Sequence, residues 1–357
     1  MLTSEVQYLR RRLFLQYDKY SPSSTSASIT RHHAHAPEVK SLMSTCRTVF
    51  EPYAAFIPDF PAFCAALQTP RPCCLRVNTL RTTPGVVREL LMSQGYSVTP
   101  SPIADELLLV PNLTHPGRLR EALLGYYHPQ AFTSGLVSRI VAPQSGELVC
   151  DLCAAPGSKT SHMAQLMNNQ GIIVANEPVH TRLAVLEYNL KHLGVSNVVT
   201  THYTGQNFPL RCKFTRVLVD APCSGEGNYR CDMQGRVQHV RRATGAPDDL
   251  PRLQKQLLIR GFDILAPGGS LIYATCTYNP AENEAVVQEL LEQRPSTIQP
   301  ITLQVPHSPG LLQWKEHTYD ACMQHCWRLY PHQTGSVGFF VASIRAGAAT
   351  QCRAGVF

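Results

Sequence analysis

The sequence predicts an α/β protein in which a doubly wound, mainly parallel sheet follows a smaller α+β domain. After Tyr127, apolar strand-like runs alternate regularly with helical patterns. The chain has 357 residues and is 44% hydrophobic, enough for a large core and for two domains. Four of the strand-like runs end at Asp151, Glu177, Asp220 and Cys276. Ligands of doubly wound sheets bind outside the carboxyl ends of the strands, so we expect a site there.

The first part of the chain is predicted to contain an extension and a small domain. Residues 1–45 have a basic helical pattern, a Ser-rich stretch and three nearby histidines. We expect a flexible extension with solvated histidines, although an organelle transit peptide has the same composition. Residues 46–130 are predicted to form a small α+β RNA-binding domain, with strands at 74–79 and 106–110 and a helix at 84–94.

Residues 131–346 are predicted to form the main domain, with 347–357 as a C-terminal tail. We expect strands at 148–152, 171–177, 197–203, 216–221 and 269–276, and helices at 159–167, 179–193 and 252–265. The segments 327–330 and 337–345 are predicted to close the sheet as an antiparallel hairpin. This alternation favours a parallel sheet with helices on both faces.

The segment from Asp151 to Thr160 follows a strand and begins a helix. Its small residues let a ligand approach the backbone, and the first amides of the helix face that ligand. The spacing fits neither a Walker loop nor the glycine fingerprint of dinucleotide-binding folds, which excludes a nicotinamide oxidoreductase. Glu177 ends the next strand, where it would bind ribose hydroxyls or only cap the helix after Pro178.

Cys223 and Cys276 follow two strands that would be neighbours in such a sheet. Paired thiols beside a cofactor loop favour covalent catalysis, because a thiolate is a strong nucleophile. Each cysteine taken singly could also be a packing residue. Asp220 ends the first of these strands, and a buried carboxylate there is costly unless it is used.

Charge and cysteine content indicate the compartment and the partner. The formal net charge of +7 fits an acidic partner such as RNA without establishing one. The thirteen cysteines are scattered, which favours reduced thiols in an intracellular compartment. No apolar run is long enough for a membrane span. Five arginines of the small domain are candidates for an RNA path, with an ordinary basic surface as the alternative: Arg76, Arg81, Arg88, Arg118 and Arg120.

Five motifs in order resemble the Sun family of RNA (cytosine-5)-methyltransferases, also called the NOL/NOP/Sun or Fmu family. They are residues 75–80, 154–160, 220–225, 273–276 with 279–284, and 330–332 with 338–340. The resemblance extends from about Phe50 to Arg345. It implies a class I, Rossmann-like methyltransferase fold that binds S-adenosylmethionine.

The resemblance also implies roles for single residues. Cys276 would attack the base, Cys223 would assist release, and Asp220 would stabilise the adduct at the nitrogen 3 edge of cytosine. Lys159 is expected to act with them, and Lys159 and Arg230 would favour the thiolate or bind phosphate, unless they are solvated charges. The implied cofactor site comprises Cys153, Ala154, Ala155, Pro156, Gly157, Ser158, Lys159, Glu177, Arg182, Thr204 and Asp220.

The predicted substrate is RNA, with rRNA preferred to tRNA, and no DNA or membrane partner is expected. We expect a monomer in the cytoplasm and leave a nucleolar or organellar place open. Thr204 stands where the family usually has an Asp, and the loop after Gly227 departs from the family pattern. These departures support a rival hypothesis, an inactive RNA-binding scaffold of the same fold.

A DNA cytosine methyltransferase is a second rival, but those enzymes use a Pro-Cys-Gln motif, and here Ser224 follows Pro222-Cys223. No metal site is predicted. The pair Cys150 and Cys153 has no second ligand pair, and the group Cys322, His325 and Cys326 on an expected helix is judged equally unsuited to zinc.

Overall fold

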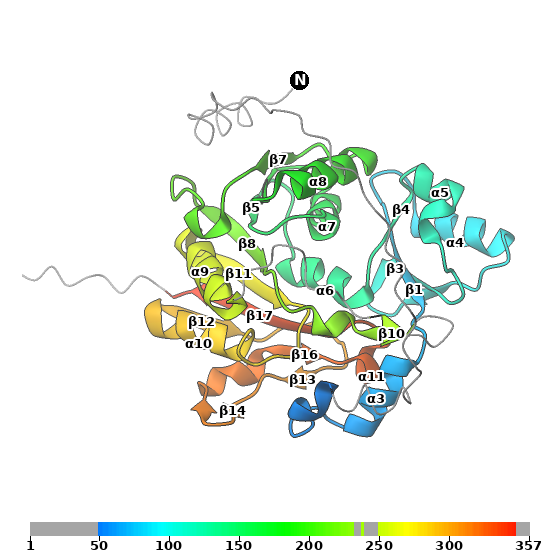
Figure 1. Ribbon diagram of the computed structural model, residues 1–357. Coiled ribbons are helices and arrows are strands. Elements are labelled where there is room, and N and C mark those ends of the chain that lie inside the picture. Colours follow the sequence, from blue (N-terminus) through cyan, green and yellow to red (C-terminus); the bar gives the residue numbers. More distant parts are fainter. Residues whose placement is uncertain (1–48, 232–236, 239–248, 348–357) are drawn as a thin grey trace, which may run out of the picture.

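The computed structural model describes residues 49–231, 237–238 and 249–347, so the predicted extension with its histidines, and the tail beyond residue 347, lie outside the described residues. Two larger sheets organise the described chain, one of four strands and one of nine (Figure 1). Two-stranded pairs, β9 (Arg230–Cys231) with β10 (Val237–Gln238) and β14 (Gln313–Trp314) with β15 (His317–Thr318), lie beside them. The predicted combination of an α/β domain with a smaller α+β unit is confirmed.

The nine-stranded sheet is parallel at its centre and antiparallel at one end. The parallel strands are β7 (Val198–Thr201), β6 (Ile172–Asn176), β5 (Leu148–Asp151), β8 (Phe214–Asp220) and β11 (Leu265–Thr275). Strand β6 is buried along its whole length, as expected for a strand covered on both faces. Leu265 was expected in the preceding helix, but it begins β11, which runs irregularly until Ser270.

The antiparallel end confirms the predicted closing hairpin and extends it. Strand β17 (Phe339–Ala346) pairs with β11, with β16 (Trp327–Leu329) and with β12 (Ser296–Gln299), and β13 (Ser308–Pro309) pairs with β16. The hairpin connection contains a short helix, α11 (Pro331–Thr334), which ends at Gly335 with φ 64°. A positive φ there favours glycine.

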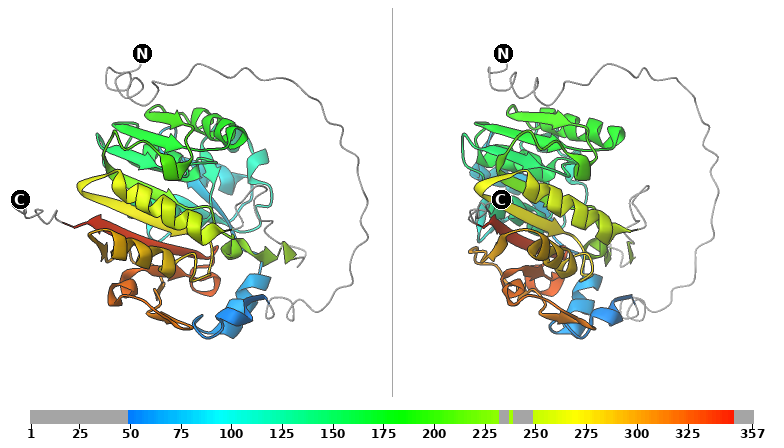
Figure 2. Two further views of the ribbon diagram at one scale, coloured as in Figure 1. Left: turned by 60° about the vertical axis from the view of Figure 1, so that its left-hand side comes forward. Right: turned by 90° about the vertical axis from the view of Figure 1, so that its left-hand side faces the viewer.

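Helices cover both faces of the large sheet. On one face α9 (Leu250–Asp263) and α10 (Glu284–Gln293) pack against each other and against the strands (Figure 2). On the other, α6 (Phe132–Val141) and α7 (Ser158–Leu166) bury Leu136, Val137 and Met163 in a separate core. Helix α8 (His180–His192) contacts α7 and β7. The predicted doubly wound arrangement is therefore confirmed, whereas α6 and α10 were not predicted.

The four-stranded sheet is antiparallel throughout, in the order β2 (Thr99–Ser101), β3 (Ala104–Val110), β1 (Cys73–Val77) and β4 (Tyr127–Pro129). Helix α4 (Pro84–Ser93) follows the N-cap residue Thr83, whose hydroxyl accepts from the Val86 amide. This helix buries Val87 and Leu91 in the core of the small sheet. The short helices η2 (Pro116–Arg118) and α5 (Arg120–Leu123) precede β4. The predicted strand, helix and strand of this unit are confirmed.

The segment before residue 70 packs away from that sheet. Helix α3 (Phe60–Gln68), preceded by the 3-10 helix η1 (Glu51–Tyr53), contacts α11 (Figure 1). Its aromatic core joins Phe50 and Phe63 to Tyr229, Tyr278 and Tyr330 of the large domain. Part of the segment 46–130 thus packs on the antiparallel end of the large sheet, and its assignment to one small domain stays a prediction.

Two negative findings hold for the described ranges. No helix within them has the length and apolar character that a bilayer span requires. They also contain no group of three or more His, Cys, Asp or Glu side chains placed to hold a metal ion. Cys322 lies in the 3-10 helix η5 (Ala321–His325), where a regular helix was expected, and Cys326 is buried directly after it.

Candidate active site

The site lies where β8 and β11 end side by side. These strands are parallel neighbours, with Asp220 in register with Ala274, and the Ala221 amide donates to the Ala274 carbonyl at 3.0 Å. Because parallel neighbours end at the same edge, the loops after them meet. This pairing brings Asp220, Cys223 and Cys276 together, as the sequence predicted.

The two thiols are in contact. The Sγ atoms of Cys223 and Cys276 are 3.3 Å apart, and the Cys276 amide donates to Cys223 Sγ at 3.3 Å. Asn228 Nδ2 donates to Cys276 Sγ at 3.1 Å. The two sulfur atoms and one amide side chain therefore form a compact cluster at the strand ends.

The contact pushes the two pKa values in opposite directions. The hydrogen bond from Cys223 lowers the pKa of Cys276 below its ordinary value, and Lys159 and Asn228 add to that effect against burial and Asp220. The same contact, followed by burial, raises the pKa of Cys223 well above the ordinary thiol value. These directions make Cys276 the more readily deprotonated thiol of the pair and Cys223 its proton donor.

Lys159 and Asp220 form an ion pair beside the thiols. Lys159 Nζ lies 2.7 Å from Asp220 Oδ2, with 11% of the lysine side chain and 28% of the aspartate side chain exposed. The same ammonium lies 5.1 Å from the centre of the Phe339 ring. Lys159 is in the first turn of α7, so the helix that follows the cofactor loop also supplies a cation to the cysteine site.

Backbone contacts fix the two cysteine loops against each other. The Gly227 amide donates to the Cys276 carbonyl at 2.8 Å, and the Gly227 carbonyl accepts from the Gly338 amide at 2.9 Å. A β-carbon on Gly227 would lie 2.2 Å from the Gly338 oxygen, so this approach requires glycine. Glu226 accepts from the Thr277 hydroxyl at 2.9 Å and from the Tyr53 hydroxyl at 3.0 Å, which ties both loops to the N-terminal segment.

The predicted cofactor loop turns sharply between β5 and α7. The Ala155–Pro156 bond is cis, and Gly157 has φ 100°, with Leu186 so close that a β-carbon would lie 2.8 Å from it. Ala154 and Ala155 are buried against α8. These two alanines can offer a ligand only their backbone.

Ser158 is held by the small sheet. Its carbonyl accepts from Arg76 Nη1 at 2.7 Å, and its hydroxyl is hydrogen-bonded to His128 at 2.8 Å. Arg76 Nη2 also donates to the Ser161 hydroxyl at 2.8 Å. Arg76 is 1% exposed, so the prediction that it lines an RNA path is wrong. Its guanidinium instead hydrogen-bonds to the first turn of α7.

Glu177 and Arg182 lie beside the same loop. Glu177 is buried, and one carboxylate oxygen accepts from the Val179 amide at 3.0 Å, but α8 begins at His180 with Val179 as its N-cap and no side-chain cap, so Glu177 does not cap this helix. Its other oxygen is 3.5 Å from Arg182, which also donates to the Ala155 carbonyl at 2.9 Å. A carboxylate has about four acceptor positions, so Glu177 keeps capacity for ribose hydroxyls.

Thr204 is exposed at the end of the next connection. Its hydroxyl accepts from Asn207 Nδ2 at 3.1 Å. Gly205 follows it, and a β-carbon there would lie 2.5 Å from Leu257. A β-carbon at Gly205 would therefore have to displace the end of the Leu257 side chain, whereas the hydroxyl of Thr204 lies at the surface.

Three carboxylates surround Cys153. Burial, Asp151, Asp220 and Glu177 all raise the pKa of this thiol well above its ordinary value, so Cys153 does not compete as a nucleophile. Burial raises the pKa of Asp151 to about 7, and its Oδ1 has no hydrogen-bond partner among the described residues. Asp220 pairs with Lys159 and Glu177 with Arg182, so the Oδ1 atom of Asp151 is the buried polar atom of this group that is open to a ligand.

Sequence reasoning missed Asn228 and Asn176. Asn228 lies in the loop after Gly227, whose departure from the family pattern hid its role. Asn176 ends β6, accepts from the Tyr203 amide at 2.9 Å and donates to the Leu152 carbonyl at 3.2 Å, which joins three strand ends. A polar residue at a buried strand end was the available signal for Asn176.

Two family models match the chain. Residues 138–345 match the family described as 16S rRNA methyltransferase RsmB/F, and residues 54–114 match a ferredoxin-like domain described as RsmF/B-like. The second match lies within the predicted small domain. Residues 115–137, between the two matches, are covered by neither.

Named relatives are similar over most of this chain. A human protein named 28S rRNA (cytosine(4447)-C(5))-methyltransferase is 36% identical over 81% of this chain but only 36% of its own length. A Pyrococcus abyssi protein named tRNA (cytosine(49)-C(5))-methyltransferase is 32% identical, over 81% of this chain and 93% of its own. The chain thus spans about a third of the first of these relatives and nearly all of the second.

A solved structure shares the fold. The crystal structure of a methyltransferase homolog protein from Pyrococcus horikoshii is 29% identical, with a TM-score of 0.72 over 86% of this chain and 100% of that one. The similarity extends across both sheets rather than the large sheet alone.

Proposed function

We propose that this chain, which belongs to the 16S rRNA methyltransferase RsmB/F family, transfers a methyl group from S-adenosylmethionine to carbon 5 of a cytosine in RNA. The observation that carries the proposal is the pair of touching thiols with opposite pKa shifts beside the Lys159–Asp220 ion pair. Carbon 5 of cytosine is a poor nucleophile, so this methylation needs a thiolate that adds to the ring first.

S-adenosylmethionine supplies an electrophilic methyl group when it is bound. We assign its binding to the loop from Cys153 to Lys159, to Glu177 with Arg182, and to Thr204 and Asp220. Glu177 supports ribose binding through its free acceptor capacity, and the buried Oδ1 of Asp151 is a further acceptor without a partner among the described residues. Ala154 and Ala155 take part through the backbone, and Ser158 acts mainly by positioning the loop.

Cys276 is the nucleophile of the proposed reaction. Its thiolate forms a bond to carbon 6, and the ring electrons make carbon 5 nucleophilic toward the methyl group. The Lys159–Asp220 pair faces the nitrogen 3 edge of the base and can pass a proton to that nitrogen as negative charge collects there. This pair is preorganised by its 2.7 Å contact.

Cys223 completes the reaction as a base. Once the Cys276 sulfur is bonded to carbon, it carries no charge, so the main cause that raises the pKa of Cys223 is removed. Cys223 can then lose its proton to solvent and accept the proton on carbon 5. The electrons of that C–H bond restore the ring double bond and expel Cys276 as a thiolate.

The substrate proposal is single-stranded or unstacked RNA, with rRNA preferred to tRNA. An enzyme that acts on carbon 6 must reach the face of the base, which a duplex hides. The family description names 16S rRNA, and the named relatives act on 28S rRNA or tRNA. The inactive scaffold remains the second candidate, favoured by Thr204, whose hydroxyl already accepts from Asn207.

Labelled S-adenosylmethionine and separated RNA classes test the function. We expect label on a cytosine of rRNA and none on single-stranded DNA. Cys276→Ala should lower transfer by about 10³-fold or more, because the nucleophile that adds to carbon 6 is removed and the other residues of the catalytic unit cannot replace it. Cys223→Ala should leave a covalent RNA adduct that is stable on denaturing gels.

Cys322→Ala is the matched control, since Cys322 lies on η5 outside the site, and it should behave like the wild type. No transfer by the wild type to any RNA would favour the scaffold. An adduct formed by the Cys276 variant would reverse the two roles.

A further inference from the structure

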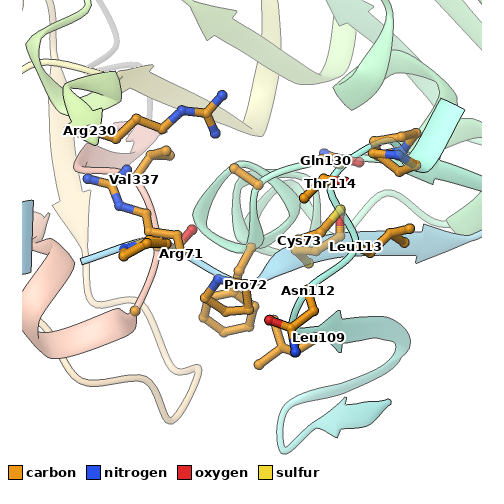
Figure 3. A pocket seen from close by; sticks show the side chains of 18 of the residues that line it. Arg71, Pro72, Cys73, Leu109, Asn112, Leu113, Thr114, Gln130, Arg230 and Val337 are labelled. Carbon is orange, nitrogen blue, oxygen red and sulfur yellow. The ribbon is translucent and has the colours of Figure 1, made fainter. Parts of the chain in front are cut away.

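A groove of about 760 Å³ lies between the small sheet and the large domain (Figure 3). Its walls are residues 70–74 at the start of β1, the turn at 112–116 after β3, the N-terminus of α6, the loop 334–337 and Arg230. Arg230 and Arg71 stand on one side, and Gln130 and Thr114 on the other. The volume is in the range of pockets that hold a ligand of nucleotide size.

Backbone hydrogen bonds link one wall of the groove to the loop that carries Cys276. Val337 lines the groove, and the next residue, Gly338, donates to the carbonyl of Gly227, whose amide donates to the Cys276 carbonyl. Arg230 follows Gly227 by three residues. An RNA strand that presents one base to Cys276 would therefore pass near this groove.

The charge of the groove favours an anion. Arg71, Arg230 and His115 line it, and none of its described lining residues is a carboxylate. Arg71 Nη2 donates to the Tyr229 carbonyl at 2.8 Å, which fixes the backbone next to Arg230. The Arg230 side chain is exposed, so its guanidinium is accessible to phosphate.

Gln130 supplies an unused hydrogen-bonding group in the same wall. It is 6% exposed, and neither its Oε1 nor its Nε2 has a hydrogen-bond partner among the described residues. Its backbone amide donates to the Cys74 carbonyl at 3.0 Å, so its position is set by β1. A buried amide without partners is costly, and a side-chain amide matches the donor and acceptor pattern of a base edge.

We propose that this groove binds a nucleotide of the RNA strand adjacent to the target cytosine. Gln130 hydrogen-bonds to the edge of that base, and Arg230 contacts the backbone phosphate. Unstacked bases expose both edges to side chains, as this contact requires. This proposal rests on the proposed function in one respect only, namely that the bound strand is the RNA that carries the target cytosine.

Direct RNA binding without cofactor tests the groove separately from methyl transfer. The probe is a labelled single-stranded oligoribonucleotide of about 12 nucleotides, within the range that such sites cover. Affinity is measured by fluorescence anisotropy at several salt concentrations for the wild type, Gln130→Leu and Arg230→Ala. Arg345→Ala is the control for loss of one positive charge. Arg345 is exposed, and it lies in register with Ser270, at the end of β11 away from Cys276.

The two variants have different expected signatures. Gln130→Leu should weaken binding about tenfold with an unchanged salt slope, since a base contact and not a phosphate contact is lost. Arg230→Ala should weaken binding and reduce the slope of log K against log salt by about 0.7. Gln130→Leu should keep or raise the melting temperature, because it removes a buried polar group without partners.

Equal affinity of Gln130→Leu, Arg230→Ala and Arg345→Ala for the probe would overturn the proposal, and a protein segment would then be the better occupant. Normal RNA binding by the groove variants with normal methyl transfer would leave the proposed function standing and remove the groove from it. Weakened binding by the two groove variants, in a wild type that methylates no RNA, would support the groove and reject the activity.

Discussion

The two adjacent thiols at this site differ in how readily each loses its proton. The chemistry of Cys223 and Cys276 is the same, and their difference comes from geometry: Asn228 donates to Cys276, and Lys159 lies near it. Burial acts on both thiols and alone would keep both protonated. The neighbours therefore decide which sulfur is charged.

The first prediction concerns the pH dependence of alkylation. Cys276 should react with iodoacetamide at neutral pH before Cys223, because its pKa is lowered. In Cys223→Ala the largest lowering cause is lost, so the pKa of Cys276 rises and the rate profile moves to higher pH. Mass spectrometry of the alkylated peptides against pH measures both effects.

Asn228→Ala should move the profile in the same direction by a smaller amount, because Asn228 contributes less to the lowered pKa. An unchanged profile in Cys223→Ala, or first alkylation at Cys223, would show that the other sulfur carries the charge.

At the scale of elements, loops from separate strands are locked by short backbone contacts. Gly227 lies between the carbonyls of Gly338 and Cys276, where a β-carbon would be 2.2 and 2.9 Å from the two oxygens. Backbone atoms cannot rotate away as a flexible side chain does. A substitution at Gly227 must therefore displace the loop that carries Cys276.

The second prediction is that Gly227→Ala lowers methyl transfer by about 10²-fold, the effect of a displacement of about 1 Å at a reacting group. Cofactor affinity should stay unchanged, because the cofactor loop follows a different strand. Single-turnover kinetics and calorimetric titration measure the two quantities. Gly117→Ala is the control, since a β-carbon there meets nothing within 4 Å. Equal transfer by both variants would refute the locking role.

The third prediction concerns the support that the small sheet gives to α7. Arg76→Met removes the donors to the Ser158 carbonyl and to the Ser161 hydroxyl. We expect stability to fall by about 1 to 3 kcal/mol from the loss of these two hydrogen bonds to a charged donor, and the loosened loop to bind the cofactor more weakly. Arg81→Met is the control, because Arg81 makes an exposed contact to the Leu124 carbonyl. Unchanged cofactor affinity in Arg76→Met would limit Arg76 to a role in stability.

At the scale of the whole molecule, a buried ion pair joins the antiparallel end of the sheet to its helical layer. Arg328 on β16 donates to Glu284 on α10 at 2.7 Å, with 2% and 0% of the two side chains exposed. The guanidinium also donates to the Tyr278 carbonyl at 2.9 Å and lies 4.8 Å from the centre of the Phe56 ring. One side chain thus contacts the sheet, the helix, the cysteine loop and the N-terminal segment.

The fourth prediction compares two glutamates of α10. Glu284→Gln should cost about 3 to 5 kcal/mol in the free energy of unfolding, because it leaves the Arg328 charge buried without its partner. Glu289→Gln breaks a partly exposed pair with Lys255 and should cost at most about 1 kcal/mol. Urea denaturation followed by circular dichroism measures both. Equal costs would show that the buried pair contributes no more than a surface pair.

Local patterns in the sequence predict the order of the elements and the residues at the strand ends. Apolar runs bounded by helical patterns are local signals, and parallel neighbours must end at one edge, so Asp220, Cys223 and Cys276 were placed together without coordinates. Helix α6 was not predicted because it lies at the expected domain boundary near residue 131. Helix α10 was not predicted because it begins at Glu284, the last residue of the motif at 279–284.

The unequal acidity of the two thiols, the burial of Arg76, the packing of α3 and the lining of the groove do not follow from these local patterns. Each depends on contacts between residues far apart in the chain: 48 positions separate Asn228 from Cys276, and 85 separate Arg76 from Ser161. Periodicity reports the face on which a residue lies but not the partner that meets it there. A shifted pKa, a hydrogen bond or a cavity depends on residues from two separate segments, and only the folded chain brings those segments into contact.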